Sequence, residues 1–168
     1  MSDPIQVRPA VRGEVAAILA IYNHAVVHTT ANYDYEPRTL AQRLEWFDAH
    51  ERDHFPICVA ATPVGEIVGW SSLSRYHEKP GYRFTAENSI YLAEEHRGRG
   101  LGARLLSPLI DAARSLGLHA IIAVIDGDNV ASVRLHTRFG FEQVGHFRQI
   151  GFKFNRWLDV IYMERLID

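Results

Sequence analysis

The stretch "ENSIYLAEEHRGRGLGARLL", residues 87–106, decides the fold of this chain, because it joins an extended segment to a helix through a turn rich in glycine and arginine. Gly98, Gly100 and Gly102 stand at alternate positions at the start of that helix. Glycine in a helix carries a cost in conformational entropy. We therefore expect that something approaches this turn so closely that side chains cannot be accommodated there.

Composition bounds the size and the class of the protein. The 168 residues, with 47% apolar content, suffice for one well-buried core and are short for two, so we expect a single domain over 1–168. The 18 basic and 20 acidic residues nearly cancel, to a net charge of −2. That balance disfavours a nucleic-acid binder, because phosphate affinity comes from clustered lysine and arginine.

Cysteine content and hydropathy exclude further classes. The single cysteine, Cys58, rules out a disulfide framework, and its apolar neighbours predict a buried, inert thiol. His24 and His28 lack the carboxylate partner of a metal-binding helix, so no metal site is expected. The first residues carry no apolar signal region, and no stretch approaches the ~20 apolar residues of a membrane span. We expect a soluble, cytoplasmic protein without a membrane partner.

Hydrophobic periodicity predicts an α/β order around the opening stretch. Leu101, Leu105 and Leu109 mark a helix that ends near Gly117, and Pro108 inside it predicts a kink. The strand before this helix and the apolar run after it should pair in parallel through a right-handed crossover. The predicted strands are 5–10, 55–62, 66–74, 84–93, 119–125, 141–151 and 157–167, and the predicted helices are 14–26, one that Thr39 caps, 101–116, and one that Asn129 caps and Gly140 ends.

Two kinds of ligand fit the glycine turn. Gly98-x-Gly100-x-x-Ala103 matches the dinucleotide pattern of a Rossmann unit, with Asp126 at the end of the next strand. That unit normally opens its domain, whereas here a long segment precedes it. The unpaired N–H groups at a helix start, free of side chains, equally form a concave site for the diphosphate of another cofactor.

Three separated motifs resemble the GNAT superfamily of N-acetyltransferases. The spacing Arg97-x-x-Gly100-x-Gly102 is similar to its pyrophosphate-binding signature, and "NVASVRLHTRFGF", residues 129–141, resembles its next helix. The segments "TAENSIYL", "VASVRLH", "GFKFNRWLDV" and "NHAVVHTTANYDYEP" resemble the phosphinothricin and methionine sulfoximine acetyltransferase branch. The resemblance covers essentially the whole chain. It implies a central mixed, twisted β-sheet with helices on both faces, whose fourth and fifth strands splay apart.

The resemblance implies acetyl-CoA as the cofactor and no metal. The backbone of the fourth strand would pair with the pantetheine arm, and one of its amides would polarise the thioester carbonyl. The turn would hold the diphosphate. The cofactor-binding residues that the resemblance implies are Ile90, Tyr91, Leu92, Arg97, Gly98, Arg99, Gly100, Leu101, Gly102, Ala103, Asn129 and Ser132. Asn129 is also a good helix cap in its own right.

Acetyl transfer to an amine needs a base, because amines are mostly protonated at neutral pH. By the resemblance, Glu87 is the candidate catalytic base, and its pKa must rise above the ordinary ~4.3 unless a water molecule relays the proton. His136 is the second candidate catalytic residue, because it stands where many superfamily members carry a tyrosine proposed to protonate the departing thiolate. Histidine can act as acid or base there. A buried structural histidine is the alternative.

The resemblance also implies the acceptor and its pocket. A loop over 75–85 would line the pocket, and Lys79 or Arg83 would hold a substrate carboxylate. The substrate-binding residues expected are Asn32, Tyr33, His77, Glu78, Lys79, Tyr82, Arg83, Glu87, Asn88 and Ser89. By the same resemblance, the segment "GFKFNRW" would be a strand that runs to a homodimer interface and helps to close the pocket. The expected reaction acetylates the α-amine of a small amino acid or analogue, and another small amine, a protein N-terminus or a non-catalytic acyl-CoA-binding module is the alternative.

Overall fold

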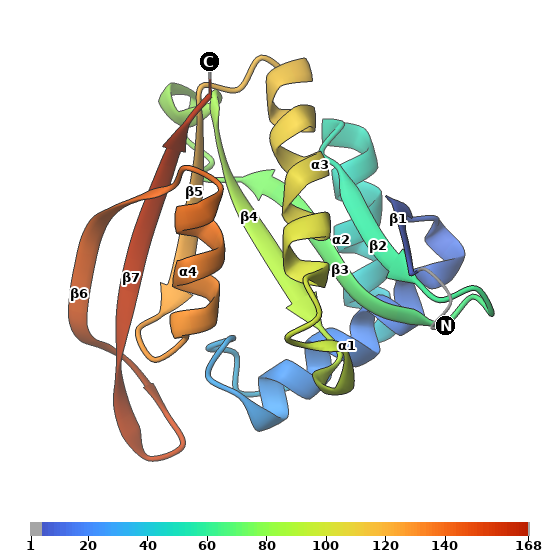
Figure 1. Cartoon of the computed structure of the whole chain (residues 1–168), viewed down its shortest axis with the longest axis horizontal. Coiled ribbons are helices and arrows are strands. Elements are labelled where there is room, and N and C mark those ends of the chain that lie inside the picture. The colour runs from blue at the N-terminus through green and yellow to red at the C-terminus, as the bar shows by residue number, and fades with distance from the viewer. Residues whose placement is uncertain (1–4, 168) are drawn as a thin grey trace.

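The computed structural model describes residues 5–167, which form a seven-stranded sheet flanked by helices (Figure 1). The strand order is β1-β2-β3-β4-β5-β7-β6, and only β4 and β5 run parallel. The strands are β1 (Gln6–Pro9), β2 (Ile57–Ala61), β3 (Ile67–Arg75), β4 (Thr85–Leu92), β5 (Ala120–Asp126), β6 (Glu142–Lys153) and β7 (Arg156–Leu166). The helices are α1 (Val15–His28), α2 (Leu40–Asp53), α3 (Leu101–Ser115) and α4 (Val130–Arg138). This mixed sheet with helices on its faces confirms the predicted fold class.

Alternation along the strands separates two cores, one on each face of the sheet. In β2, Cys58 and Ala60 belong to the cluster that packs against the buried leucines of α3. Ile57 and Val59 belong to a second cluster with residues of α1 and α2. Successive strand residues point to opposite faces, so one short apolar strand serves both layers. The buried thiol of Cys58, expected from its neighbours, is confirmed.

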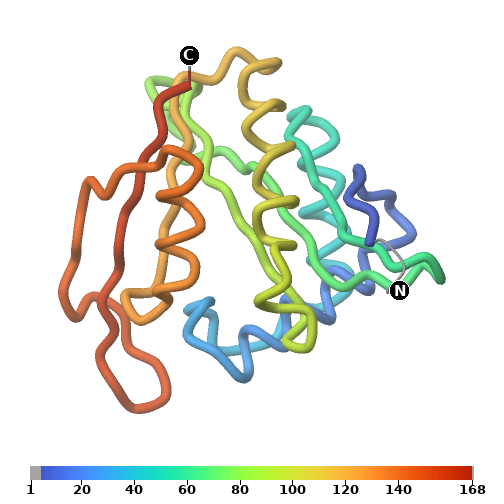
Figure 2. Tube along the Cα trace, in the orientation of Figure 1, coloured from blue at the N-terminus to red at the C-terminus, as the bar shows by residue number. Residues whose placement is uncertain are grey.

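The sheet opens between β4 and β5. The two strands pair only at Thr85–Glu87 with Ala120–Ile122, and no later residue of β4 pairs with β5. Figure 2 shows the two strands leaving this point side by side and then diverging. The parallel pair and the splay are both confirmed. Past Glu87, the edge of β4 that faces β5 therefore has backbone N–H and C=O groups without a strand partner.

Helix starts follow the local signals in the sequence. The hydroxyl of Thr39 accepts a hydrogen bond from the backbone N–H of Gln42 in a capping box, and Asn129 caps α4 in a similar way through Ser132. Helix α3 begins after Gly100 and continues through Pro108 to Ser115. The kink expected at Pro108 stays a prediction.

The last hairpin differs from the expectation. Strands β6 and β7 extend to Lys153 and from Arg156, which leaves a two-residue turn. Phe154 and Asn155 in that turn have φ values of 51° and 56°, as in a type I′ turn. Phenylalanine is an uncommon residue at positive φ, so the sequence carries no signal for so tight a turn.

Within residues 5–167, no helix is long and apolar enough to cross a membrane.

Candidate active site

The turn before α3 has a backbone conformation suited to an anion. Gly98 and Gly100 have φ values of 72° and 78°, a region that only glycine enters without strain. A Cβ at either position would meet nothing within 4 Å. The glycines are therefore required first by backbone conformation, and only then by the approach of a ligand. Left-handed residues next to a helix N-terminus aim successive N–H groups at one point, where a diphosphate is favoured.

A groove of about 670 Å³ runs from this turn into the opening between β4 and β5. Ten of the predicted cofactor residues line it: Ile90, Tyr91, Leu92, Arg97, Gly98, Gly100, Gly102, Ala103, Asn129 and Ser132. Arg99 is exposed outside the groove, and Leu101 is buried in the core beneath α3. A long groove with an anion site at one end and an unpaired strand edge along its wall fits coenzyme A. The turn would hold the diphosphate, and the edge of β4 would pair with the pantetheine amides.

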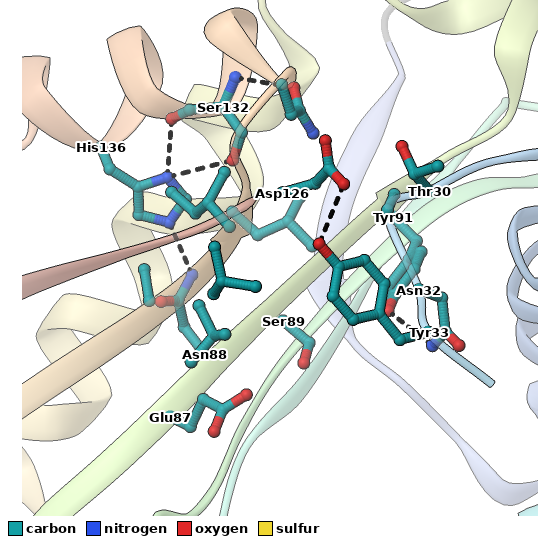
Figure 3. Close-up of a pocket in the computed structure, with 17 residues that line it drawn as sticks. Thr30, Asn32, Tyr33, Glu87, Asn88, Ser89, Tyr91, Asp126, Ser132 and His136 are labelled. Atoms are coloured by element: carbon teal, nitrogen blue, oxygen red, sulfur yellow. Dashed lines mark hydrogen bonds between the residues drawn. The ribbon is translucent and has the colours of Figure 1, made fainter. Parts of the chain in front are cut away.

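A second cavity of about 260 Å³ continues the groove toward Glu87. Both spaces are lined by Ile90, Tyr91, Asn129 and Ser132. Figure 3 shows how β4 lies along this cavity, with Glu87 and Ser89 turned to one side and Asn88 turned toward His136 on α4. Asn32 and Tyr33 lie across the cavity, on the segment that follows α1. The structure thus brings five predicted substrate residues, Asn32, Tyr33, Glu87, Asn88 and Ser89, together with the predicted cofactor residues.

Glu87 stands where two cavities meet. It lines the 260 Å³ cavity and a third one of about 410 Å³ on the other side. Burial raises the pKa of its carboxyl group above its ordinary value, and no described charged group offsets that shift. A partly buried carboxylate with a raised pKa and open space on two sides can accept a proton from a bound amine.

His136 is held by hydrogen bonds at both ring nitrogens. Its Nδ1 lies 2.8 Å from the carbonyl oxygen of Ser132, so Nδ1 carries the proton and donates it. Its Nε2 then accepts from the Asn88 amide at 2.9 Å. Burial lowers the pKa of the imidazole, which is therefore neutral at pH 7. With both nitrogens engaged, the ring is placed to orient Asn88 on β4, which favours a positioning role over proton transfer.

The segment 29–33 is hydrogen-bonded to side chains of β5 and β6. The hydroxyl of Tyr33 donates to the Asp126 carboxylate at 3.0 Å. The Nζ of Lys153, on β6, donates to the backbone carbonyls of Thr29 and Asn32. The lysine is buried, and nothing in the sequence distinguishes it from a surface lysine. Lys153 therefore belongs among the residues that shape the wall of the cavity.

We expect Gly151→Ala to loosen this wall, because Tyr33 packs directly on the backbone of Gly151. An added Cβ would lie 2.5 Å from the Tyr33 ring, so the ring must move. The expected cost is about 1–3 kcal/mol in the free energy of unfolding, measured with urea. Gly145→Ala on the same strand is the control, since its Cβ finds ordinary contacts from 3.5 Å outward. Equal stability of the two variants would contradict the contact.

The loop between β3 and β4 lies elsewhere. The predicted substrate residues His77, Glu78, Lys79, Tyr82 and Arg83 are exposed and line none of the three cavities. Their role in substrate binding stays a prediction.

No group of three or more His, Cys, Asp or Glu side chains in the described part of the chain is arranged to hold a metal ion.

No motif in the sequence predicts the third cavity. Its lining includes Arg43, Trp46 and Trp70, together with Glu87 and Ser89 from β4. The one available signal was Arg43, which follows Leu40 by three residues and precedes Phe47 by four. That spacing places a cation on the apolar face of a helix.

The fold and the site are those of a protein that could bind an acyl-CoA beside a partly buried carboxyl group. A model of the acetyltransferase (GNAT) family matches residues 18–141. The chain is 44% identical over 162 residues to the L-methionine sulfoximine/L-methionine sulfone acetyltransferase of Pseudomonas paraeruginosa, over 96% of this chain and 94% of that protein.

Solved structures agree with this match. The yncA protein of Salmonella typhimurium with its cofactor acetyl-CoA has a TM-score of 0.95 and 38% identity, over 99% of this chain and 95% of that one. A GNAT superfamily phosphinothricin acetyltransferase from Sinorhizobium meliloti in complex with acetyl-CoA has a TM-score of 0.94 and 36% identity, over 97% and 88%. The chain therefore belongs to the acetyltransferase (GNAT) family, and it is an acyltransferase whose cofactor is acetyl-CoA. Family membership also decides the cofactor in favour of acetyl-CoA over a dinucleotide.

Proposed function

We propose that this enzyme acetylates the α-amine of a small amino acid or amino-acid analogue, with methionine sulfoximine, methionine sulfone and phosphinothricin as the first acceptors to test. The observation that carries the proposal is the position of Glu87. Its unpaired carboxyl group lies where the end of the cofactor groove meets two small cavities. The names of the relatives supply the acceptors, since they act on amino-acid analogues.

Each part of the chain then has a chemical task. Acetyl-CoA supplies the acetyl group and the thiol that leaves. The turn at Gly98 and Gly100 holds the diphosphate, and the unpaired edge of β4 aligns the pantetheine arm so that a backbone N–H polarises the thioester carbonyl. Glu87 takes one proton from the ammonium group of the acceptor, and the free amine then attacks the thioester carbonyl. As the new C–N bond forms and the C–S bond breaks, the second proton of the nitrogen passes to the departing thiolate, which leaves as the free thiol of coenzyme A. His136 holds Asn88, and with it the position of the strand from which these groups project.

The enzyme is also proposed to act as a homodimer. Large apolar side chains are exposed along the β6–β7 hairpin: Val144, Phe147, Ile150, Phe152, Phe154 and Trp157. Such a row is typical of a surface that a partner covers. Sedimentation over a range of protein concentrations tests this, and a monomer throughout the range would contradict it.

The function is tested by measuring free thiol released from acetyl-CoA. The acceptors are L-methionine sulfoximine, L-methionine sulfone, phosphinothricin, a polyamine and a peptide with a free N-terminus. Release is expected with the amino-acid analogues and not with the last two. Silence across all acceptors, from protein that binds acetyl-CoA in calorimetry, would contradict the proposal.

A further inference from the structure

The third cavity holds a buried cation without an anion. Arg43 on α2 is 6% exposed, and its Nε and Nη2 atoms have no hydrogen-bond partner among the described residues. Buried polar groups are nearly always paired, and an unpaired buried charge is costly. An arginine in this state, on the wall of a cavity of about 410 Å³, indicates that its partner arrives with a ligand.

Aromatic rings hold the guanidinium in place. Its Cζ lies 3.6 Å from the ring centre of Trp46, 4.5 Å from that of Trp70 and 4.6 Å from that of Tyr22. The electron-rich ring faces favour the cation and fix its plane, but they offer no acceptor to its N–H groups. The side chain is therefore positioned in advance, with its hydrogen-bonding capacity unused.

The other charges around this cavity leave Arg43 free. Arg38, the second cation of the lining, is paired with Asp34 at 2.9 Å. Among the described residues of the lining, Glu87 is the only carboxylate, and burial alone accounts for the shift of its pKa. Arg43 and Glu87 thus face one cavity as an unpaired cation and an unpaired base. That pattern matches a molecule that carries an anion and an amine, as an amino acid does.

We propose that Arg43 is the receptor for an oxyanion of the acceptor amino acid, held so that the amine of the same molecule reaches Glu87. The inference rests on the proposed function and names the group that the acceptor must carry. A planar guanidinium fork matches a carboxylate in two parallel hydrogen bonds, and it accepts a phosphinate in the same way. A free cation in this cavity also repels polyamines. The exposed cations of the β3–β4 loop are not needed for this task.

The test compares an acceptor with its carboxylate and the same acceptor without it. L-methionine sulfone has one anionic group, and its carboxamide has none, while both keep the α-amine. For Arg43→Gln we expect kcat/KM with the acid to fall about 100-fold, mainly through KM, because one partner of a buried charge pair is lost. With the carboxamide, little change is expected. Arg43→Lys should lie between the two, because it keeps the charge without the fork.

The control is Arg52→Gln, which removes an exposed arginine from the same helix and should leave both acceptors unchanged. Thermal melting shows whether the Arg43 variants fold. Phosphinothricin and its carboxamide separate the two oxyanions, since the carboxamide keeps only the phosphinate. If Arg43→Gln weakens the phosphinothricin carboxamide as well, the phosphinate is the group bound, and the proposed oxyanion receptor still holds.

Calorimetry gives a readout that needs no turnover. L-methionine sulfone is titrated into the protein with coenzyme A bound, and binding about 100-fold weaker is expected for Arg43→Gln. The inference is overturned if folded Arg43→Gln keeps the affinity of the wild type and the same preference for acid over carboxamide. Should the wild type bind the acid through Arg43 and yet acetylate no acceptor, the proposed function fails while the oxyanion site stands.

Discussion

Glu87→Gln is expected to lower kcat by about 10²–10⁴-fold, the range that a positioned acid or base contributes. Glutamine keeps the size of the side chain and removes the proton acceptor. The cofactor groove does not depend on the carboxylate, so the affinity for acetyl-CoA should stay unchanged. Steady-state thiol release and calorimetry with acetyl-CoA measure the two effects separately. Glu142→Gln, at an exposed glutamate on β6, is the matched control.

The pH dependence of kcat provides a second check on the same residue. The base must be deprotonated, so kcat falls as the pH drops through the pKa of Glu87. Because burial raises that pKa, the fall should occur at a higher pH than for an ordinary glutamate. Burial moves the pKa of His136 in the opposite direction, so this ring stays neutral as the pH rises above neutrality. An unchanged acidic limb in Glu87→Gln would remove Glu87 from the proton transfer.

Gly100→Ala is expected to weaken acetyl-CoA binding about tenfold or more, since a residue with a Cβ at left-handed φ costs roughly 1–2 kcal/mol and each 1.4 kcal/mol is tenfold. The φ of Gly100 is 78°, and the residue caps α3. To relieve the strain, the turn must move, and its N–H groups then no longer converge on the diphosphate. Calorimetric titration with acetyl-CoA measures the loss.

Gly65→Ala is the control for strain alone. Gly65 has a φ of 86° and open space around it, in the hairpin between β2 and β3. Both variants should lose thermal stability, but only Gly100→Ala should lose affinity for the cofactor. Equal affinity for acetyl-CoA in the two variants would mean that the turn does not hold the diphosphate.

Much of the fold follows from local causes in residues 87–106. The glycine turn can only be a strand-to-helix connection, because Gly98 and Gly100 need positive φ and the leucines that follow repeat on one helical face. The parallel pairing of β4 with β5 then follows from the handedness of such crossovers. The β6–β7 turn could not be predicted in the same way, because Phe154 has a positive φ that a phenylalanine rarely adopts.

The sequence predicts the parts of the candidate site that the backbone forms, but not the parts that distant side chains bring together. The predicted groove residues lie in the stretch 90–103 and at the start of α4, so motif spacing places them. Lys153 gives no local sign, since its acceptors are carbonyls 124 and 121 residues away. Arg43 gives a sign, a cation on an apolar helix face, but only the structure shows that no anion meets it.

The most direct test of the proposed reaction follows the acetyl group itself. Acetyl-CoA with an isotopically labelled acetyl group is incubated with the enzyme and L-methionine sulfone, and the products are identified by mass spectrometry while thiol is counted. The mechanism predicts one label on the α-nitrogen of the amino acid for each thiol released, with both lost together in Glu87→Gln. Thiol release without labelled amino acid, or labelled product formed equally well by Glu87→Gln, would contradict it.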